Sequence, residues 1–216
     1  CTQLNPRATF AAMVYRLDVY VGQLVQKLKD KGIYDNTIII FASDNGPHRE
    51  GGADPDFFNS NGIWRGYKRD LYEGGIRVPM IISWPGHIQA GTETNFMCSF
   101  WDLMPTFEEL LNPKAAVKEM DGVSMLPLLE NRKGQKEHEY LYFEFQELNG
   151  RQAVRKGSWK LVHMNIRGEK PYYELYNLAA DPSEKYNLLN KYPEKAEELK
   201  AIMLEAHTDD PNWPLF

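Results

Sequence analysis

The sequence predicts an α/β fold, with part of a three-layer α/β/α sheet in residues 1–131 and a small antiparallel α+β subdomain in residues 132–216. Three observations predict it. A long amphipathic helix leads through a short connection into an uninterrupted β-branched run, which is half of a βαβ unit. A second apolar run follows a long polar loop. Beyond the polar residues 131–134 the pattern changes to alternating strands separated by turns, and ends with one helix.

The first helix begins at Asn5-Pro6, where a capping side chain precedes proline at the first helical position. Apolar residues recur at helical spacing as far as Leu28 and form one face. Gly32 follows, where a helix ends. Residues 37–42 then predict a strand that is apolar on both faces, which is typical of a central parallel strand covered by helices.

The remaining elements follow in order. A loop rich in glycine, asparagine and aspartate runs from residue 43 to about 66, and ordered loops of this length are usually functional. Residues 76–84 predict a second buried strand, and residues 102–111 and 122–130 predict short helices. In the subdomain we expect strands at 140–145, 152–155, 158–164 and 172–178, and a helix at 193–207.

Composition excludes several classes of function. The net charge is -5 and the signs are interspersed, so no basic patch predicts a nucleic-acid partner. No apolar run approaches the roughly 20 residues of a transmembrane helix, and we expect no signal peptide with an apolar core within these residues. Cys1 and Cys98 are too few for a disulfide framework. A Cys1–Cys98 bridge, a lipid anchor at Cys1 and a plain chain boundary at Cys1 all stay open.

The strongest local signal is Asp44-Asn45-Gly46, directly after the first predicted strand. Ligands bind at the carboxyl ends of strands in open α/β sheets. Asp44 offers carboxylate oxygens and Asn45 a carbonyl oxygen, which suit calcium or magnesium. Two oxygens cannot complete a calcium site, which takes about six to eight ligands. The same residues are also typical of an ordinary Asx turn.

The second signal is Lys68, followed by Glu73-Gly74-Gly75 and the second strand. A lysine at this place could neutralise charge on a substrate anion in the transition state. A solvated surface lysine is the alternative, and spacing alone does not separate Lys68 from Arg65 or Arg69. The aromatic residues of the loop, with Arg65, either line a substrate groove or anchor the loop; they are Phe57, Phe58 and Trp64.

Together these segments resemble the sulfatase family, which belongs to the alkaline phosphatase-like superfamily. The resemblance rests on Ser43-Asp44-Asn45-Gly46 and on Lys68-x4-Glu73-Gly74-Gly75-x-Arg77-Val78-Pro79. It covers nearly the whole chain in order. Further matching segments are Tyr15-x-x-Asp18-x-x-Val21-Gly22, Trp84-Pro85-Gly86, Asp102-x-x-Pro105-Thr106, Asp121-Gly122-x-Ser124, Gly157-x-Trp159-Lys160-Leu161, Glu174-Leu175-Tyr176-Asn177-Leu178 and Asp181-Pro182.

The resemblance implies a role for each matching residue. Asp44 and Asn45 match calcium ligands, and Lys68 matches a catalytic lysine that contacts the sulfate and its ester oxygen. His48 is either a substrate-binding residue or a loop histidine bonded to the backbone. Glu73 and Arg77 are expected to pair and support the loop. The substrate would be a sulfated carbohydrate or an aryl sulfate, and the family suggests a periplasmic or extracellular location.

The chain lacks several groups that the family has. No Cys/Ser-x-Pro/Ala-x-Arg segment is present, so the residue that becomes formylglycine, the nucleophile, is missing. The early aspartate ligands are missing too. We therefore expect the C-terminal portion of a longer enzyme, inactive by itself because such groups act as a unit. A sheet cut in this way exposes an edge, which predicts self-association beside residues 37–42.

Two other readings remain. One is a phosphoester or phosphonate hydrolase of the same superfamily, which uses similar metal loops. The other is a non-catalytic module that binds calcium or a sulfated glycan without hydrolysing it, which the missing nucleophile favours.

Overall fold

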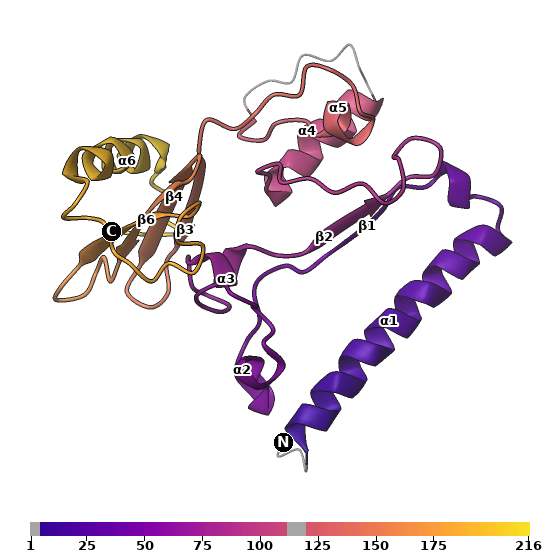
Figure 1. Cartoon of the computed structure of the whole chain (residues 1–216), viewed down its shortest axis with the longest axis horizontal. Coiled ribbons are helices and arrows are strands. Elements are labelled where there is room, and N and C mark those ends of the chain that lie inside the picture. The colour runs from indigo at the N-terminus through magenta and orange to yellow at the C-terminus, as the bar shows by residue number, and fades with distance from the viewer. Residues whose placement is uncertain (1–4, 112–119) are drawn as a thin grey trace. The chain divides into compact units, whose positions relative to one another are not determined.

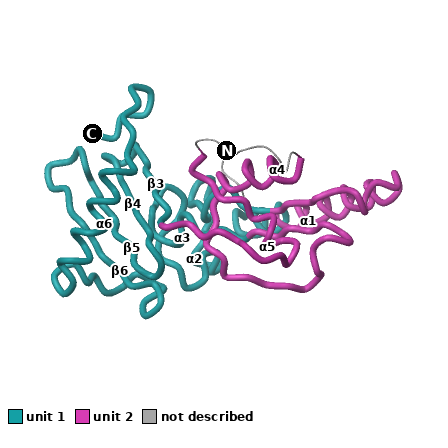
Figure 2. Tube along the Cα trace, turned by 90° about the horizontal axis from the view of Figure 1, so that it is seen from above, with its two compact units in different colours: residues 1–13, 42–79, 140–216 teal, residues 14–41, 80–139 magenta. Residues whose placement is uncertain are grey.

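The computed structural model describes residues 5–111 and 120–216, so any role for Cys1 lies outside the described residues. The chain folds into two compact units (Figure 2). Unit 1 contains residues 1–13, 42–79 and 140–216, and unit 2 contains residues 14–41 and 80–139. The predicted domain boundary after residue 131 divides the chain into two continuous parts, whereas each compact unit combines segments that are separate in sequence. The predicted boundary therefore stays a prediction.

The centre of unit 1 is the predicted antiparallel sheet (Figure 1). Its strands are β3 (Leu141–Phe145), β4 (Arg151–Lys156), β5 (Trp159–Met164) and β6 (Tyr172–Asn177), in that order. Each neighbouring pair is antiparallel. The four strands and helix α6 (Pro193–Ala206) confirm the predicted elements of the subdomain.

Both faces of this sheet are covered, and each by a different segment. On one face, Val154, Leu161 and Leu175 pack with buried residues of α6. On the other face, a buried cluster joins strand residues such as Val162 to Leu71 and Tyr72. Side chains alternate between faces along a strand, so Lys160 shares the face of Val162. The segment that carries Lys68 is therefore part of the core of unit 1.

Three short helical pieces lie in unit 1 between β1 and β2: η2 (Glu50–Gly52), α2 (Pro55–Phe58) and α3 (Glu73–Ile76). Helix α2 was not predicted, although Asp54 caps it and Pro55 occupies its first turn. The start of α1 fixes this region. Arg7 donates to Asp54 at 2.7 Å, and the ring of Phe10 lies 5.2 Å from that of Phe58.

The other elements are α1 (Pro6–Asp30), η1 (Tyr34–Asn36), β1 (Ile39–Ala42), β2 (Met80–Ser83), η3 (Phe100–Asp102), α4 (Leu103–Leu111) and α5 (Leu126–Leu129). Asn5 caps α1 as predicted, since its side-chain oxygen accepts from the amide of Ala8 at 3.1 Å. The second strand begins later than predicted because α3 occupies residues 73–76 and Pro79 has no amide hydrogen to give a ladder.

Two expectations about the first sheet are wrong. The amide of Ser43, just after β1, donates to the carbonyl of Pro79, just before β2, at 3.4 Å. The end of β1 therefore lies beside the start of β2, and the paired strands run antiparallel rather than parallel. Neither strand is fully buried, and Phe41 is 38% exposed. In the described residues this sheet has two strands, too few to enclose a strand on both sides.

The apolar face predicted for α1 is likewise not buried, and Leu24 is 67% exposed. Cys98 is a free, half-buried cysteine. Within residues 5–111 and 120–216, none of the helices combines the length and apolar composition that a membrane span requires.

Candidate functional site

Two loops of unit 1 meet through their backbones and bring the predicted site residues into one region. The amide of Gly46 donates to the carbonyl of Gly75 at 2.9 Å, and the amide of Lys68 donates to the carbonyl of Pro47 at 2.8 Å. A Cβ atom on Gly46 would lie 1.9 Å from the carbonyl oxygen of Gly74. Only glycine permits this approach, so the Asp-Asn-Gly sequence serves packing as well as turning.

Asp44 and Asn45 follow β1 side by side. Asp44 is exposed and Asn45 is half-buried. The Asn45 side-chain amide donates to Asp44 Oδ1 at 2.6 Å, and the Ser43 hydroxyl donates to the Asn45 carbonyl at 2.8 Å. The second Asp44 oxygen and Asn45 Oδ1 accept no hydrogen bond from any described side chain. The pair thus offers hard oxygen donors of the kind calcium prefers.

The number of these donors fits only part of a calcium site. Among the residues that the structure describes, no group of three or more histidine, cysteine, aspartate or glutamate side chains could hold a metal ion. Asp44 and Asn45 therefore fit calcium in their chemistry, and the remaining ligands would have to come from other groups.

Lys68 differs from the neighbouring cations Arg65 and Arg69 in its contacts. Arg69 forms ion pairs with Glu50 at 2.7 Å and with Glu147 at 3.5 Å. Arg65 is held by other groups. Lys68 has no salt-bridge partner among residues 5–111 and 120–216, although its charge helps to lower the pKa of Glu50 after the hydrogen bond and charge of Arg69. Geometry thus separates the three cations where spacing did not.

The side chains of the predicted site are not bonded to one another beyond the Asp44–Asn45 contact. In the described part of the chain, no hydrogen bond or ion pair joins Lys68 to Asp44 or Asn45. His48 is exposed, and its Nδ1 accepts from the backbone amide of Glu50 at 3.0 Å. That bond favours protonation of the other nitrogen, Nε2, and leaves it directed away from the backbone. The roles of Lys68 and His48 stay predictions.

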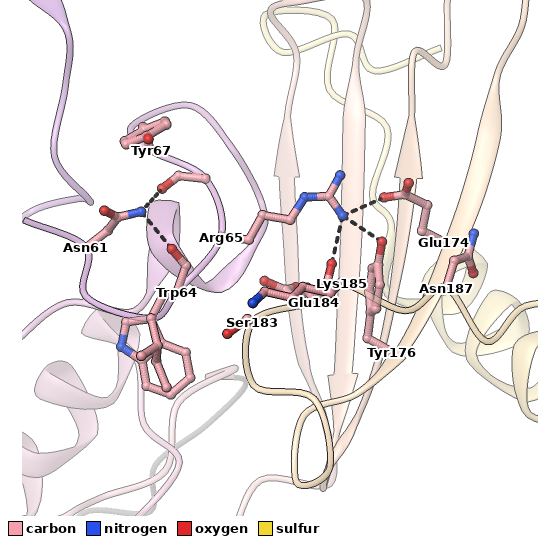
Figure 3. Close-up of a pocket in the computed structure, with 12 residues that line it drawn as sticks. Asn61, Trp64, Arg65, Tyr67, Glu174, Tyr176, Ser183, Glu184, Lys185 and Asn187 are labelled. Atoms are coloured by element: carbon pink, nitrogen blue, oxygen red, sulfur yellow. Dashed lines mark hydrogen bonds and ion pairs between the residues drawn. The ribbon is translucent and has the colours of Figure 1, made fainter. Parts of the chain in front are cut away.

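Arg65 anchors the loop and also lines a groove, so both of its predicted alternatives remain compatible with the structure. Its Nη1 donates to the Tyr176 hydroxyl at 2.7 Å and to the Glu184 carbonyl at 2.9 Å, as Figure 3 shows. The guanidinium also lies 3.8 Å from the centre of the Tyr72 ring. These contacts form one wall of a groove of about 650 Å³ within unit 1.

Sequence reasoning predicted the pair of Glu73 and Arg77, and the structure confirms it at 3.5 Å. It missed the other groups that hold Glu73. Lys160 lies 3.0 Å and Arg155 3.2 Å from the Glu73 carboxylate, and Glu184 accepts from the Glu73 amide at 2.7 Å. Burial alone would raise the pKa of Glu73, but the charges of Lys160 and Arg155 outweigh it and hold that pKa below its usual value.

Two family models and several known proteins match this chain. The family model described as "N-sulphoglucosamine sulphohydrolase, C-terminal" matches residues 62–209, and the sulfatase model matches residues 2–113. Human arylsulfatase A is 32% identical over 92% of this chain and 43% of its own length. The N-acetylgalactosamine-6-O-sulfatase of Bacteroides thetaiotaomicron is 30% identical over 91% of this chain and 41% of its own.

Among solved structures, that of Ps i-CgsB in complex with k-i-k-neocarrahexaose superposes with a TM-score of 0.80 at 31% identity, over 99% of this chain and 46% of that one. The chain thus spans less than half the length of these relatives. The family models, the relatives and the shared fold agree, and the chain belongs to the sulfatase family of sulfate ester hydrolases, within the alkaline phosphatase-like fold.

Proposed function

We propose that this chain is part of an enzyme that hydrolyses sulfate esters of carbohydrates, and that it supplies two calcium ligands and one catalytic lysine. One observation carries the proposal: the glycine-mediated contact between the Asp44–Asn45 loop and the Lys68 loop. It gathers two oxygen donors and an uncommitted ammonium group at neighbouring backbone positions. A metal-assisted site for an anionic substrate needs both kinds of group.

Asp44 and Asn45 would hold calcium through their free side-chain oxygens, together with ligands from outside this chain. When bound, the ion would supply positive charge to the sulfate oxygens. The Lys68 ammonium would donate to the sulfate and to the ester oxygen, stabilising charge that develops as the S–O bond breaks. His48 would bind the substrate through Nε2, because its Nδ1 already accepts a backbone hydrogen bond.

Support for the substrate class comes from the substrates of related proteins and not from a contact within this structure. One relative is an N-acetylgalactosamine-6-O-sulfatase, and one solved relative is in complex with k-i-k-neocarrahexaose. We propose a sulfated sugar on this basis, with an aryl sulfate as the simpler analogue. A periplasmic or extracellular location, where such polymers occur, is part of the same proposal.

The formylglycine nucleophile would come from outside these 216 residues, because no Cys/Ser-x-Pro/Ala-x-Arg segment lies within them. The chain alone would therefore not turn over substrate. We also propose that isolated copies associate through the unpaired edges of the two-stranded sheet, since neither β1 nor β2 pairs with a third described strand.

The gene offers the first test. An in-frame Cys/Ser-x-Pro/Ala-x-Arg segment upstream of the codon for Cys1 would support the proposal. The complete gene product should then hydrolyse 4-nitrophenyl sulfate and a 6-sulfated N-acetylhexosamine faster than 4-nitrophenyl phosphate. Replacing Lys68 by methionine should lower kcat/KM by about 100-fold or more. The exposed Lys31→Met is the matched control and should leave it unchanged.

Three results would contradict the proposal. Faster hydrolysis of the phosphate ester would favour the phosphoester reading. Binding of the sulfated sugar with no hydrolysis of either ester would favour the non-catalytic reading. Equal activity of Lys68→Met and the parent would remove the lysine from the reaction.

A further inference from the structure

We propose that Glu184 is a positioning residue that fixes the Lys68 loop against the Asp44–Asn45 loop, although it lies more than 100 residues from either in sequence. The proposal takes its meaning from the proposed function, since it concerns the same site. Its evidence is independent, because it rests on a chain of contacts inside unit 1.

Three groups converge on Glu184. Its Oε2 accepts from the backbone amide of Glu73 at 2.7 Å, and its Oε1 lies 2.9 Å from the Lys160 ammonium. Its main-chain carbonyl accepts from Arg65 Nη1 at 2.9 Å, a contact drawn in Figure 3. One residue thus holds the loop at both ends of the segment 65–73, with its side chain at one end and its backbone at the other.

Glu184 combines a buried charged side chain with a backbone conformation that is unfavourable for a residue other than glycine. The side chain is 0% exposed, and φ is 51°, in the left-handed region that glycine favours. Burial raises the pKa of its carboxyl despite the neighbouring Lys160 charge. A glycine would satisfy the backbone here at no steric cost, so the glutamate side chain must contribute through its contacts.

These contacts reach the site through the backbone. Glu73 begins α3, and the next amide, of Gly74, donates to the carbonyl of Arg65 at 2.6 Å. This hydrogen bond closes residues 65–74 into a tight loop that contains Lys68. The next residue, Gly75, accepts from the amide of Gly46 through its carbonyl at 2.9 Å. Holding Glu73 and Arg65 in place thus fixes the surface on which Gly46 and its neighbours Asp44 and Asn45 rest.

A simpler reading is that Glu184 only neutralises Lys160 and so stabilises the four-stranded sheet. The two readings differ in where loosening occurs. A general loss of stability would increase amide hydrogen exchange throughout unit 1 in parallel. Loss of positioning would increase it locally, at the amides that join the two site loops.

The test is amide hydrogen exchange of the full chain, measured by NMR, in Glu184→Gly and in Glu184→Gln. Glycine suits the positive φ but removes the carboxylate. Asn131→Gly is the matched control, since Asn131 is an exposed residue with φ of 52°. We expect Glu184→Gly to raise exchange of the Gly46 and Lys68 amides at least tenfold more than that of Val154 in β4. Asn131→Gly should leave all three unchanged.

Glu184→Gln keeps an acceptor for the Glu73 amide and the carbonyl for Arg65, so it should partly restore protection of Gly46 and Lys68. If Glu184→Gly does not fold, Glu184→Gln alone decides: a selective rise at these two amides supports positioning. A rise that is equal at Val154, or no rise at all, overturns it. Exchange requires neither substrate nor metal, so an inactive enzyme would refute the proposed function without touching this result.

Discussion

Replacing Lys160 by methionine should destabilise unit 1 more than any surface lysine replacement. The Lys160 side chain is 0% exposed and lies between two carboxylates, 3.0 Å from Glu73 Oε1 and 2.9 Å from Glu184 Oε1. Methionine is close in length and flexible enough to fill the same space. The change therefore removes one charge and little volume, and leaves two acidic groups buried without the cation between them.

The expected loss is about 3 to 5 kcal/mol of unfolding free energy, the range for breaking a buried ion pair by removing one partner. The attraction itself is worth less than this, because most of the loss is the desolvation of the carboxylates that remain. Arg155 still contacts Glu73 at 3.2 Å, which favours the lower end of the range. Lys195→Met is the control, since it disrupts a half-exposed surface pair worth at most about 1 kcal/mol.

Urea denaturation followed by far-UV circular dichroism measures the difference. The double variant Lys160→Met/Glu184→Gln should be destabilised by less than the sum of its single changes, by about 1 kcal/mol or more, because it removes one of the stranded charges. A loss below about 1 kcal/mol for Lys160→Met, equal to that of the control, would refute the reasoning.

Two further predictions concern a glycine contact and a histidine. Gly46→Ala places a methyl group 1.9 Å from a main-chain oxygen, so it should lower the free energy of unfolding in urea by about 1 to 3 kcal/mol. Gly22→Ala, which has open space in α1, is the control and should raise that free energy by up to about 1 kcal/mol. Equal effects of the two changes would contradict the close contact at Gly46. Burial alone would lower the pKa of His207, but Glu144 and Asp209 raise it overall. The contribution of His207 to stability is therefore complete below pH 6.5, its unfolded-state pKa, and is lost as pH rises through the folded-state pKa. Between about pH 5.5 and 8.5, the urea midpoint of His207→Gln should change less than that of the parent. An identical change in both proteins would contradict this assignment.

Local patterns were enough to predict most elements of this fold. The capped start of α1, the hairpin across Lys156-Gly157 and the helix α6 all depend on residues close in sequence, and all are present. The predicted site residues lie on two loops that meet in unit 1, and their roles stay predictions. Gly46 and Lys68 are joined through the backbones of neighbouring residues, as a shared site requires.

What the sequence could not reveal depends on distant partners. A strand that is apolar on both faces predicts burial but not direction, and β1 runs antiparallel to β2. The apolar face of α1 is visible in the sequence, whereas what covers it is not. Glu184 was missed because its partners, Glu73 and Lys160, are far away along the chain. The only local signal was Asp181-Pro182, which marks a turn and gives no hint of a buried carboxylate.

Under the proposed function, the contact among Gly46, Gly74 and Gly75 would hold the reacting groups in place independently of the residues that select the substrate. Close packing of main-chain atoms sets the approach of the two loops. The side chains of Glu50, Asp56 and Asn61 also hold the Lys68 loop, so the exposed side chains elsewhere in residues 49–63 are the ones that can change without disturbing it. Phe57 and Ile63 within that stretch are 56% and 61% exposed. If the proposed function holds, a combinatorial library confined to these two positions would alter the substrate preference and leave the spacing between the two loops unchanged.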